Sequence, residues 1–194
     1  MKTLMCDPKL FEKDLSGKVY IVTGANSGAG YATAAQLVKQ GAHVVGACRR
    51  VDAGKEAFAA LSAEPGSTEV MKLDLASLDS VRSFVEAFKS KHDRLDGLVN
   101  NAGVMSSPEA YTNEGYGLQF GVNYLGHFLL TELLLDLLKA SAPSRIILVS
   151  SVAHNGMGKT VPEIYFEDLD YSKREYNGTN AYEESKLAIV LNAL

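Results

Sequence analysis

The chain has 194 residues, 46% of them hydrophobic and 22% charged, which is the composition of an ordinary soluble protein, and we expect a single domain spanning residues 1–194. A formal net charge of −4 disfavours nucleic acid as a partner, and two cysteines, Cys6 and Cys48, predict free thiols and no metal site. No stretch approaches the roughly 18–20 apolar residues that span a bilayer. Residues 1–18 also lack the apolar core of a signal peptide, so we expect a soluble, cytoplasmic protein, with an organelle left open.

Short apolar runs alternate with longer segments of helical periodicity along the chain. The runs predict strands at Val19–Thr23, His43–Cys48, residues 69–73, Gly97–Asn100 and residues 145–150. The periodic segments predict helices at residues 31–40, 55–61, 78–91, 118–138 and 181–194, with a polar loop at residues 155–178. This alternation favours an α/β fold, a doubly wound parallel sheet between two layers of helices. Such sheets bind ligands at the carboxyl ends of their strands.

A glycine-rich segment lies between the first predicted strand and the first predicted helix. Residues 23–30 read Thr-Gly-Ala-Asn-Ser-Gly-Ala-Gly. Glycines let the backbone turn tightly and approach a pyrophosphate, and the helix N-terminus offers free N–H groups to that anion. An ordinary glycine-rich turn is the alternative, but the place between strand and helix favours nucleotide binding. The expected contacts are Gly24, Asn26, Ser27, Gly28, Ala29 and Gly30.

The TGxxxGxG spacing of this segment resembles that of the short-chain dehydrogenase/reductase family, and three further blocks follow in the family's order. They are Asn100-Asn101-Ala102-Gly103 after the fourth strand, Asn123 on the long helix, and the YxxxK pair Tyr182 and Lys186, preceded by Ser150-Ser151. The resemblance covers nearly the whole chain from Gly17 onward. It implies a Rossmann fold and places Asn101, Ala102 and Gly103 in the cofactor site.

Tyr182 and Lys186 are four residues apart and share one face of a helix. A phenol is a poor acid–base near neutral pH, and an ammonium one turn away favours its ionised form. Such a pair also occurs on solvated helix faces, so its meaning depends on the other blocks. The resemblance implies that Tyr182 is the acid–base, that Lys186 also holds the nicotinamide ribose, that Ser151 orients the substrate oxygen, and that Asn123 holds a water.

The end of the second strand indicates which nicotinamide cofactor binds. Members that use NAD carry an acidic residue there, whereas this chain has Arg49 and Arg50. A guanidinium can bind a 2′-phosphate through two hydrogen bonds, so we predict NADP(H) rather than NAD(H). Asp52 keeps the alternative open. Asp74 and Leu75 match the position of adenine contacts in the family.

Three segments resemble those of retinol dehydrogenases and WW-domain oxidoreductases in particular, namely residues 47–49 (Ala-Cys-Arg), residues 123–128 and residues 150–154 (Ser-Ser-Val-Ala-His). This resemblance implies a small lipophilic carbonyl or alcohol as substrate. The predicted loop carries Met157, Ile164, Tyr165 and Phe166, which either line an apolar substrate site or form a small surface cluster. A homodimer is a further expectation from the family.

The chain ends at Leu194, whereas family members continue for two more strands. We therefore expect a truncated sheet with one exposed edge, and an inactive fragment or a nucleotide-binding regulatory or scaffold protein is an alternative to an active oxidoreductase. A sugar-nucleotide epimerase is a third possibility, which the spacing of the glycines disfavours.

Overall fold

The computed structural model describes residues 7–158 and 160–193, so Cys6 and the last residue of the predicted C-terminal helix lie outside it. Its centre is a five-stranded parallel sheet in the order β3-β2-β1-β4-β5. The strands are β1 (Val19–Thr23), β2 (His43–Cys48), β3 (Ser67–Lys72), β4 (Gly97–Asn100) and β5 (Arg145–Leu148). The doubly wound α/β fold that the sequence predicts is confirmed.

The long helices follow the strands in the predicted alternation. They are α1 (Gly28–Lys39), α2 (Val51–Ala59), α3 (Leu78–Lys89), α4 (Leu118–Phe120), α5 (Gly126–Ala140) and α6 (Gly178–Leu191). Shorter turns are η1 (Pro8–Glu12), η2 (Gly121–Leu125), η3 (Val152–Gly158) and η4 (Phe166–Asp168). α1, α2 and α6 each begin three or four residues before the predicted start.

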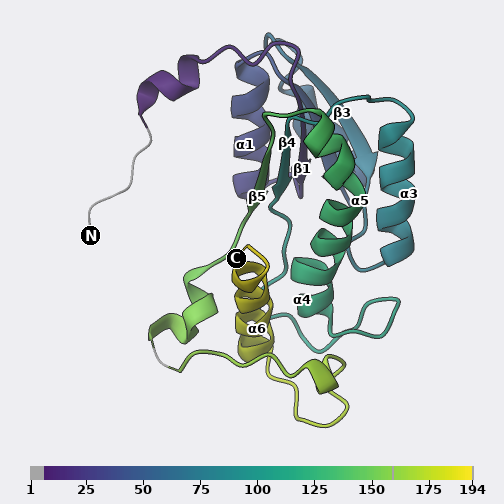
Figure 1. The fold of residues 1–194 in the computed structure, drawn as a ribbon, viewed down its shortest axis with the longest axis vertical. Helices are drawn as coiled ribbons and strands as arrows, with labels where there is room; N and C mark the ends of the chain where they lie inside the picture. The colour runs from purple at the N-terminus through teal and green to yellow at the C-terminus, as the bar shows by residue number, and fades with distance from the viewer. Residues whose placement is uncertain (1–6, 159, 194) are drawn as a thin grey trace.

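Two apolar clusters cover the two faces of the sheet and make three layers. On one face, α3 and α5 bury Phe84, Phe88 and Leu134 against strand residues such as Ile21. On the other, α1 and α2 bury Val38 and Phe58 together with Val22 and Cys48. Cys48 is a free thiol, 1% exposed, as expected of a small core residue. Figure 1 shows α1 on one side of the strands and α3 and α5 on the other.

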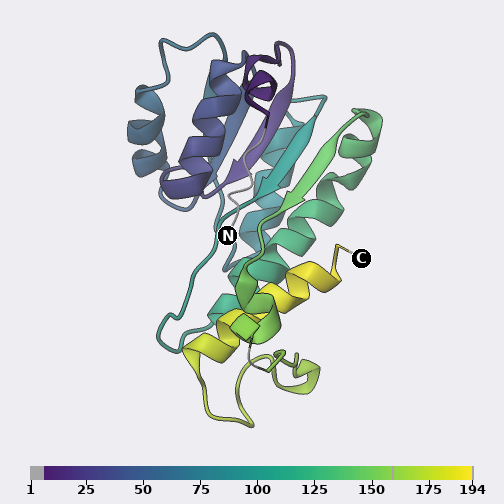
Figure 2. The ribbon, with the colours of Figure 1, turned by 90° about the vertical axis from the view of Figure 1, so that its left-hand side faces the viewer.

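The remaining elements gather at one end of the sheet. In both views α6 and the segment before it lie beyond the carboxyl ends of the strands (Figures 1 and 2). α6 packs against η3, α4 and η2 rather than against the sheet. The fold therefore brings the C-terminal helix to the end where a parallel sheet binds ligands.

β5 forms one edge of the sheet, and within the described residues no strand pairs with its outer side. Ile146 and Ile147 are 39% and 41% exposed there, in line with the open edge expected from the sequence. Between residues 7 and 193, leaving out residue 159, no helix has the length and apolar character needed to cross a membrane.

Candidate active site

Glycines shape the turn that follows β1. Gly24 and Gly28 have φ of +66° and +55°, a conformation that glycine adopts without strain. At Gly30 a Cβ would stand 2.5 Å from both the Gly24 carbonyl oxygen and the Asn101 side-chain nitrogen, so only glycine fits. A Cβ at Gly28 would meet no described atom within 4 Å. The start of α1, residues 27–29, therefore faces open space, and its first-turn N–H groups can receive an anion.

An open cleft runs from this turn past the carboxyl ends of β2, β3 and β4. Eight of the expected cofactor residues line it, namely Gly24, Asn26, Arg49, Arg50, Asp74, Leu75, Ala102 and Gly103. Arg49 and Arg50 are exposed, so the rim beside β2 is basic. Asp52, the acidic alternative, lies in the first turn of α2 and is not among the residues that line the cleft.

The hydroxyl of Thr23 joins the glycine turn to the loop after β4. It accepts hydrogen bonds from the backbone N–H groups of Asn101 and Ala102, both at 2.9 Å. The Asn101 side chain donates to the Thr23 carbonyl oxygen at 2.9 Å. Asn101 and Gly30 thus pack inside the turn, while Ala102 and Gly103 line the cleft.

Asn123 lies in a π-helical turn, η2, where the helical segment after α4 widens before α5. Its buried side chain accepts from the Val104 N–H at 2.8 Å and donates to the Val104 carbonyl and the Ser185 hydroxyl, both at 2.9 Å. The side-chain amide therefore clamps the loop after β4 to α6.

Tyr182 and Lys186 lie on α6, with the Lys186 ammonium 5.5 Å from the centre of the Tyr182 ring. Lys186 is 5% exposed and donates to the Val149 carbonyl oxygen at 2.9 Å. Burial lowers the pKa of this ammonium. A Cβ at Gly103 would lie 3.9 Å from Lys186 Nζ, so the lysine borders the cleft that Gly103 lines.

The two serines after β5 have different partners. The Ser150 hydroxyl donates to the Lys186 carbonyl oxygen at 3.0 Å and ties β5 to α6. The Ser151 hydroxyl accepts from the Ala153 N–H at 3.2 Å and leaves its own proton free to donate. The Ser150 hydroxyl is thus occupied by a contact to α6, whereas the Ser151 hydroxyl can still donate a hydrogen bond to a ligand.

A buried histidine, His127, belongs to the same network although the sequence pattern gave it no role. Its Nε2 lies 2.9 Å from the Thr23 hydroxyl and its Nδ1 lies 3.1 Å from the Asn123 carbonyl oxygen. Because a carbonyl oxygen only accepts, Nδ1 carries the proton and donates to Asn123. Nε2 then accepts from the Thr23 hydroxyl, whose other acceptor, the Val99 carbonyl oxygen, is farther away at 3.4 Å. Burial and the nearby Lys186 lower the pKa of His127 to about 4, against the effect of the Asn123 carbonyl, so the imidazole is neutral.

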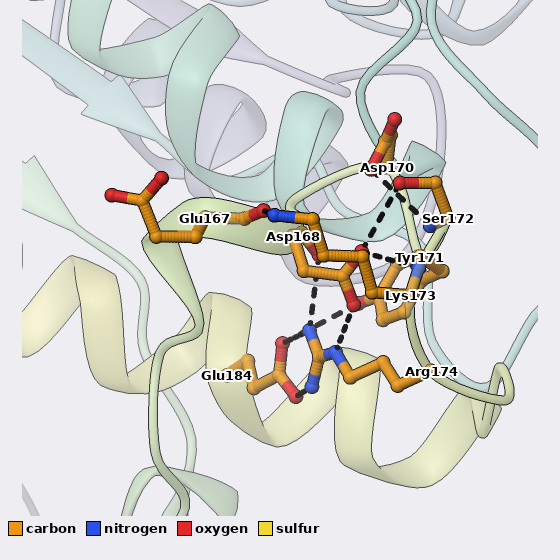
Figure 3. A network of polar contacts seen from close by, with 8 residues as sticks. All are labelled: Glu167, Asp168, Asp170, Tyr171, Ser172, Lys173, Arg174 and Glu184. Atoms are coloured by element: carbon orange, nitrogen blue, oxygen red, sulfur yellow. Dashed lines mark hydrogen bonds and ion pairs between the residues drawn. The ribbon is translucent and has the colours of Figure 1, made fainter.

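The segment before α6 is held by an arginine with two acidic partners (Figure 3). The Arg174 guanidinium donates to Asp168 at 3.0 Å and, through two nitrogens, to Glu184 on α6. Its carbon lies 4.2 Å and 4.6 Å from the ring centres of Tyr165 and Tyr171. Glu184, whose side chain is 3% exposed, follows Tyr182 by two residues, so this network fixes the helix that carries the candidate acid–base.

The sequence patterns missed Thr23, His127 and the Arg174 network. Asn123 and His127 are four residues apart, so their helical contact could have been found from spacing. The partners of Arg174 are 6 and 10 residues away in a segment of irregular structure, and no periodicity signals them.

A comparison with protein families matches residues 18–164 to the model described as short chain dehydrogenase. Among curated proteins, the chain is 49% identical over 179 residues to Retinol dehydrogenase 13 of Mus musculus, covering 91% of this chain and 52% of that protein. It is 45% identical over 192 residues to Retinol dehydrogenase 14 of Homo sapiens, covering 91% and 55%. The chain therefore spans about half the length of the curated relatives it matches.

Solved structures are also similar to this chain over most of its length. A protein of Mycobacterium paratuberculosis has a TM-score of 0.80 and 39% identity, with 92% of this chain and 61% of that chain covered. The RhlG/NADP active-site complex of Pseudomonas aeruginosa has a TM-score of 0.71 and 29% identity, with 94% and 65% covered. These likenesses each cover more than nine-tenths of the chain.

Proposed function

The chain belongs to the short-chain dehydrogenase family, and on that premise we propose that it carries the cofactor-binding and catalytic residues of an NADP(H)-dependent oxidoreductase that interconverts a lipophilic carbonyl compound and its alcohol. The observation that carries the proposal is the position of Lys186. This buried ammonium lies beside Tyr182 on α6 and borders the cleft at Gly103. A buried cation beside a phenol thus borders the cleft that the glycine-rich turn also lines.

The side chains divide the acid–base work between them. In the reducing direction the Tyr182 hydroxyl gives its proton to the carbonyl oxygen of the substrate, and in the oxidising direction it takes the proton back. The Lys186 ammonium stabilises the phenolate that remains. Ser151 donates a hydrogen bond to the same substrate oxygen, which Ser150 cannot do while bonded to Lys186. Asn123 holds η2 in shape through its amide, and by resemblance to the family it would also hold an ordered water.

The residues of the cleft suit nicotinamide adenine dinucleotide phosphate, NADP(H). The open space at Gly28 and the N–H groups of residues 27–29 suit the pyrophosphate, and Ala102 and Gly103 leave room beside Lys186. Arg49 and Arg50 would hold the 2′-phosphate. Such a cofactor, when bound, supplies or accepts the hydride.

Exposed apolar side chains support a lipophilic substrate. Met157, Tyr165 and Phe166 are 53%, 45% and 71% exposed on the segment that precedes α6. The two curated relatives described above are named retinol dehydrogenases, so retinal is the first substrate to assay.

Turnover of retinal with NADPH tests the catalytic assignment. Tyr182→Phe should abolish turnover while NADPH still raises the thermal unfolding midpoint, because the ring stays and only the proton donor is lost. Tyr20→Phe, on β1, is the matched control and should retain turnover. Undiminished turnover in Tyr182→Phe would refute the assignment. A folded wild-type chain that binds NADPH but reduces no member of a broad carbonyl panel would indicate a nucleotide-binding protein without catalysis.

The cofactor preference has its own test. Replacing Arg49 and Arg50 together by alanine should weaken NADPH binding by about 10- to 100-fold, the worth of one or two charge-assisted hydrogen bonds, and leave NADH binding unchanged. Arg82→Ala, an exposed change on α3, controls for lost charge. Equal losses for both nucleotides would show that the arginines do not read the 2′-phosphate.

A further inference from the structure

A cluster of two histidines and a carboxylate lies at the end of the sheet opposite to the cleft. His43 is the first residue of β2, Glu69 is the third residue of β3, and His92 follows α3. The cleft lies past the carboxyl ends of these strands, so the cluster has no part in the proposed oxidoreductase site. One candidate ligand atom of each side chain lies within 4.8 Å of those of the other two.

The three side chains are ordered by packing as well as by polar contacts. His92 Nε2 lies 3.1 Å from Glu69 Oε2, and the rings of His43 and His92 are 5.2 Å apart between centres. Phe88 stacks on the His92 ring at 4.6 Å between centres. The side chains of Glu69 and His92 are 24% and 14% exposed, so the cluster is screened from water but reachable from it.

Neighbouring groups leave one ligand atom on each residue turned to the cluster. The Ser67 hydroxyl lies 2.7 Å from His43 Nδ1, and when Nδ1 donates to it, Nε2 carries a lone pair. His43 Nε2 is buried, and no group in the described residues hydrogen-bonds to it. Lys91 pairs with Oε1 of Glu69 and leaves Oε2 to His92.

We propose that His43, Glu69 and His92 bind a divalent zinc ion through His43 Nε2, His92 Nε2 and Glu69 Oε2. Two imidazoles and a carboxylate are a common zinc donor set, and a tetrahedral ion with bonds of about 2.0–2.1 Å places its ligand atoms roughly 3.3 Å apart. Small side-chain rotations close the cluster to that spacing. The fourth position faces solvent and takes a water. Because the ligands come from β2, β3 and the end of α3, the ion stabilises that edge of the fold.

The sequence-based expectation of no metal site rested on the cysteine count. The three ligands here are 26 and 23 residues apart, outside any short zinc motif. The parallel pairing of β2 with β3 brings His43 near Glu69, and the turn after α3 adds His92.

Zinc titration of the metal-stripped chain tests the proposal. In a Cys6→Ser background, which removes a competing thiol, calorimetry should show one saturable zinc site, and zinc should raise the thermal midpoint. His92→Gln should weaken zinc binding by more than about 100-fold. Ser67→Ala should weaken it by about tenfold, since losing a hydrogen bond that orients a metal ligand lowers metal affinity by about 10–100-fold. His154→Gln, a histidine at the other end of the molecule, should bind as the parent does.

Cobalt keeps the test independent of whether the variants fold. The unaltered site loaded with Co²⁺ should show the intense visible absorption of a tetrahedral complex, which the aquo ion lacks. Absence of saturable zinc binding, an aquo-like cobalt spectrum, or a His92→Gln chain that is folded and binds zinc as tightly as the parent would each overturn the proposal.

Discussion

The neutral, buried state of His127 makes the stability of the fold depend on pH. In an unfolded chain a histidine has a pKa near 6.5, whereas burial lowers the pKa of His127 to about 4. As the pH falls below 6.5 the unfolded chain takes up a proton that the folded chain does not, so the free energy of unfolding falls with pH. The stability is fully present above pH 6.5 and is lost progressively towards pH 4.

The size of the effect follows from the two pKa values. A difference of about 2.5 pH units corresponds to a limit of about 3 kcal/mol, and about 2 kcal/mol of it is lost between about pH 7.5 and pH 5. Stopping near pH 5 keeps most carboxylates ionised and isolates the histidine contribution. His43, whose pKa is also lowered, adds a loss of the same sign.

Urea unfolding at a series of pH values, followed by circular dichroism, measures this dependence. His127→Gln should be less stable at neutral pH, because glutamine cannot replace both hydrogen bonds of the ring, yet its stability should fall by about 2 kcal/mol less over the same pH range. His154→Gln is the matched control and should keep the parent slope. Parallel curves for the parent and His127→Gln would refute the account of a neutral buried imidazole.

Three further changes test the contacts around the cleft and the sheet. Arg174→Leu should cost about 3 kcal/mol of unfolding free energy by leaving Glu184 buried without its cation, and adding Glu184→Leu should recover part of it; equal stability of the two variants would argue against the ion pair. Gly30→Ala should cost about 1–3 kcal/mol from overpacking, in urea unfolding, and more than Gly28→Ala, which suffers only backbone strain. Burial raises the pKa of Asp96 but its hydrogen bonds outweigh this and lower it to about 2, so the parent should lose about 2 kcal/mol from pH 4 to pH 2 that Asp96→Asn does not lose.

The five strands and their succession along the chain could be predicted from the sequence to within two residues at each end. β1, β2 and β4 match the predicted bounds because each short apolar run has polar residues or glycine within two residues of both ends. The starts of helices were less accurate. α6 begins at Gly178 because Asn177 caps the N–H groups of Thr179 and Asn180, a signal that the apolar pattern alone does not contain.

The features that could not be predicted from the sequence depend on tertiary contacts. The predicted helix over residues 118–138 is continuous, but it widens at η2 where Asn123 bonds to Val104, which no periodicity reveals. The predicted loop over residues 155–178 is largely irregular where it is described, and Arg174 ties its Asp168 to Glu184 of α6, a contact that no periodicity reveals. The cofactor and catalytic residues were all nominated from motifs, and their roles, like the homodimer, stay predictions.

The Thr23 hydroxyl has a consequence for the slow exchange of backbone hydrogens with solvent. The N–H of Ala102 lies in an irregular loop, where amide hydrogens ordinarily exchange quickly through small local openings of the chain. Its acceptor, however, is a side chain at the end of the central strand, which is itself 0% exposed. Releasing that N–H requires opening β1, so Ala102 should exchange at the rate of the sheet centre. The loop after β4 then opens only together with the centre of the sheet. The side of the cleft that it lines is therefore rigid even when no ligand is bound.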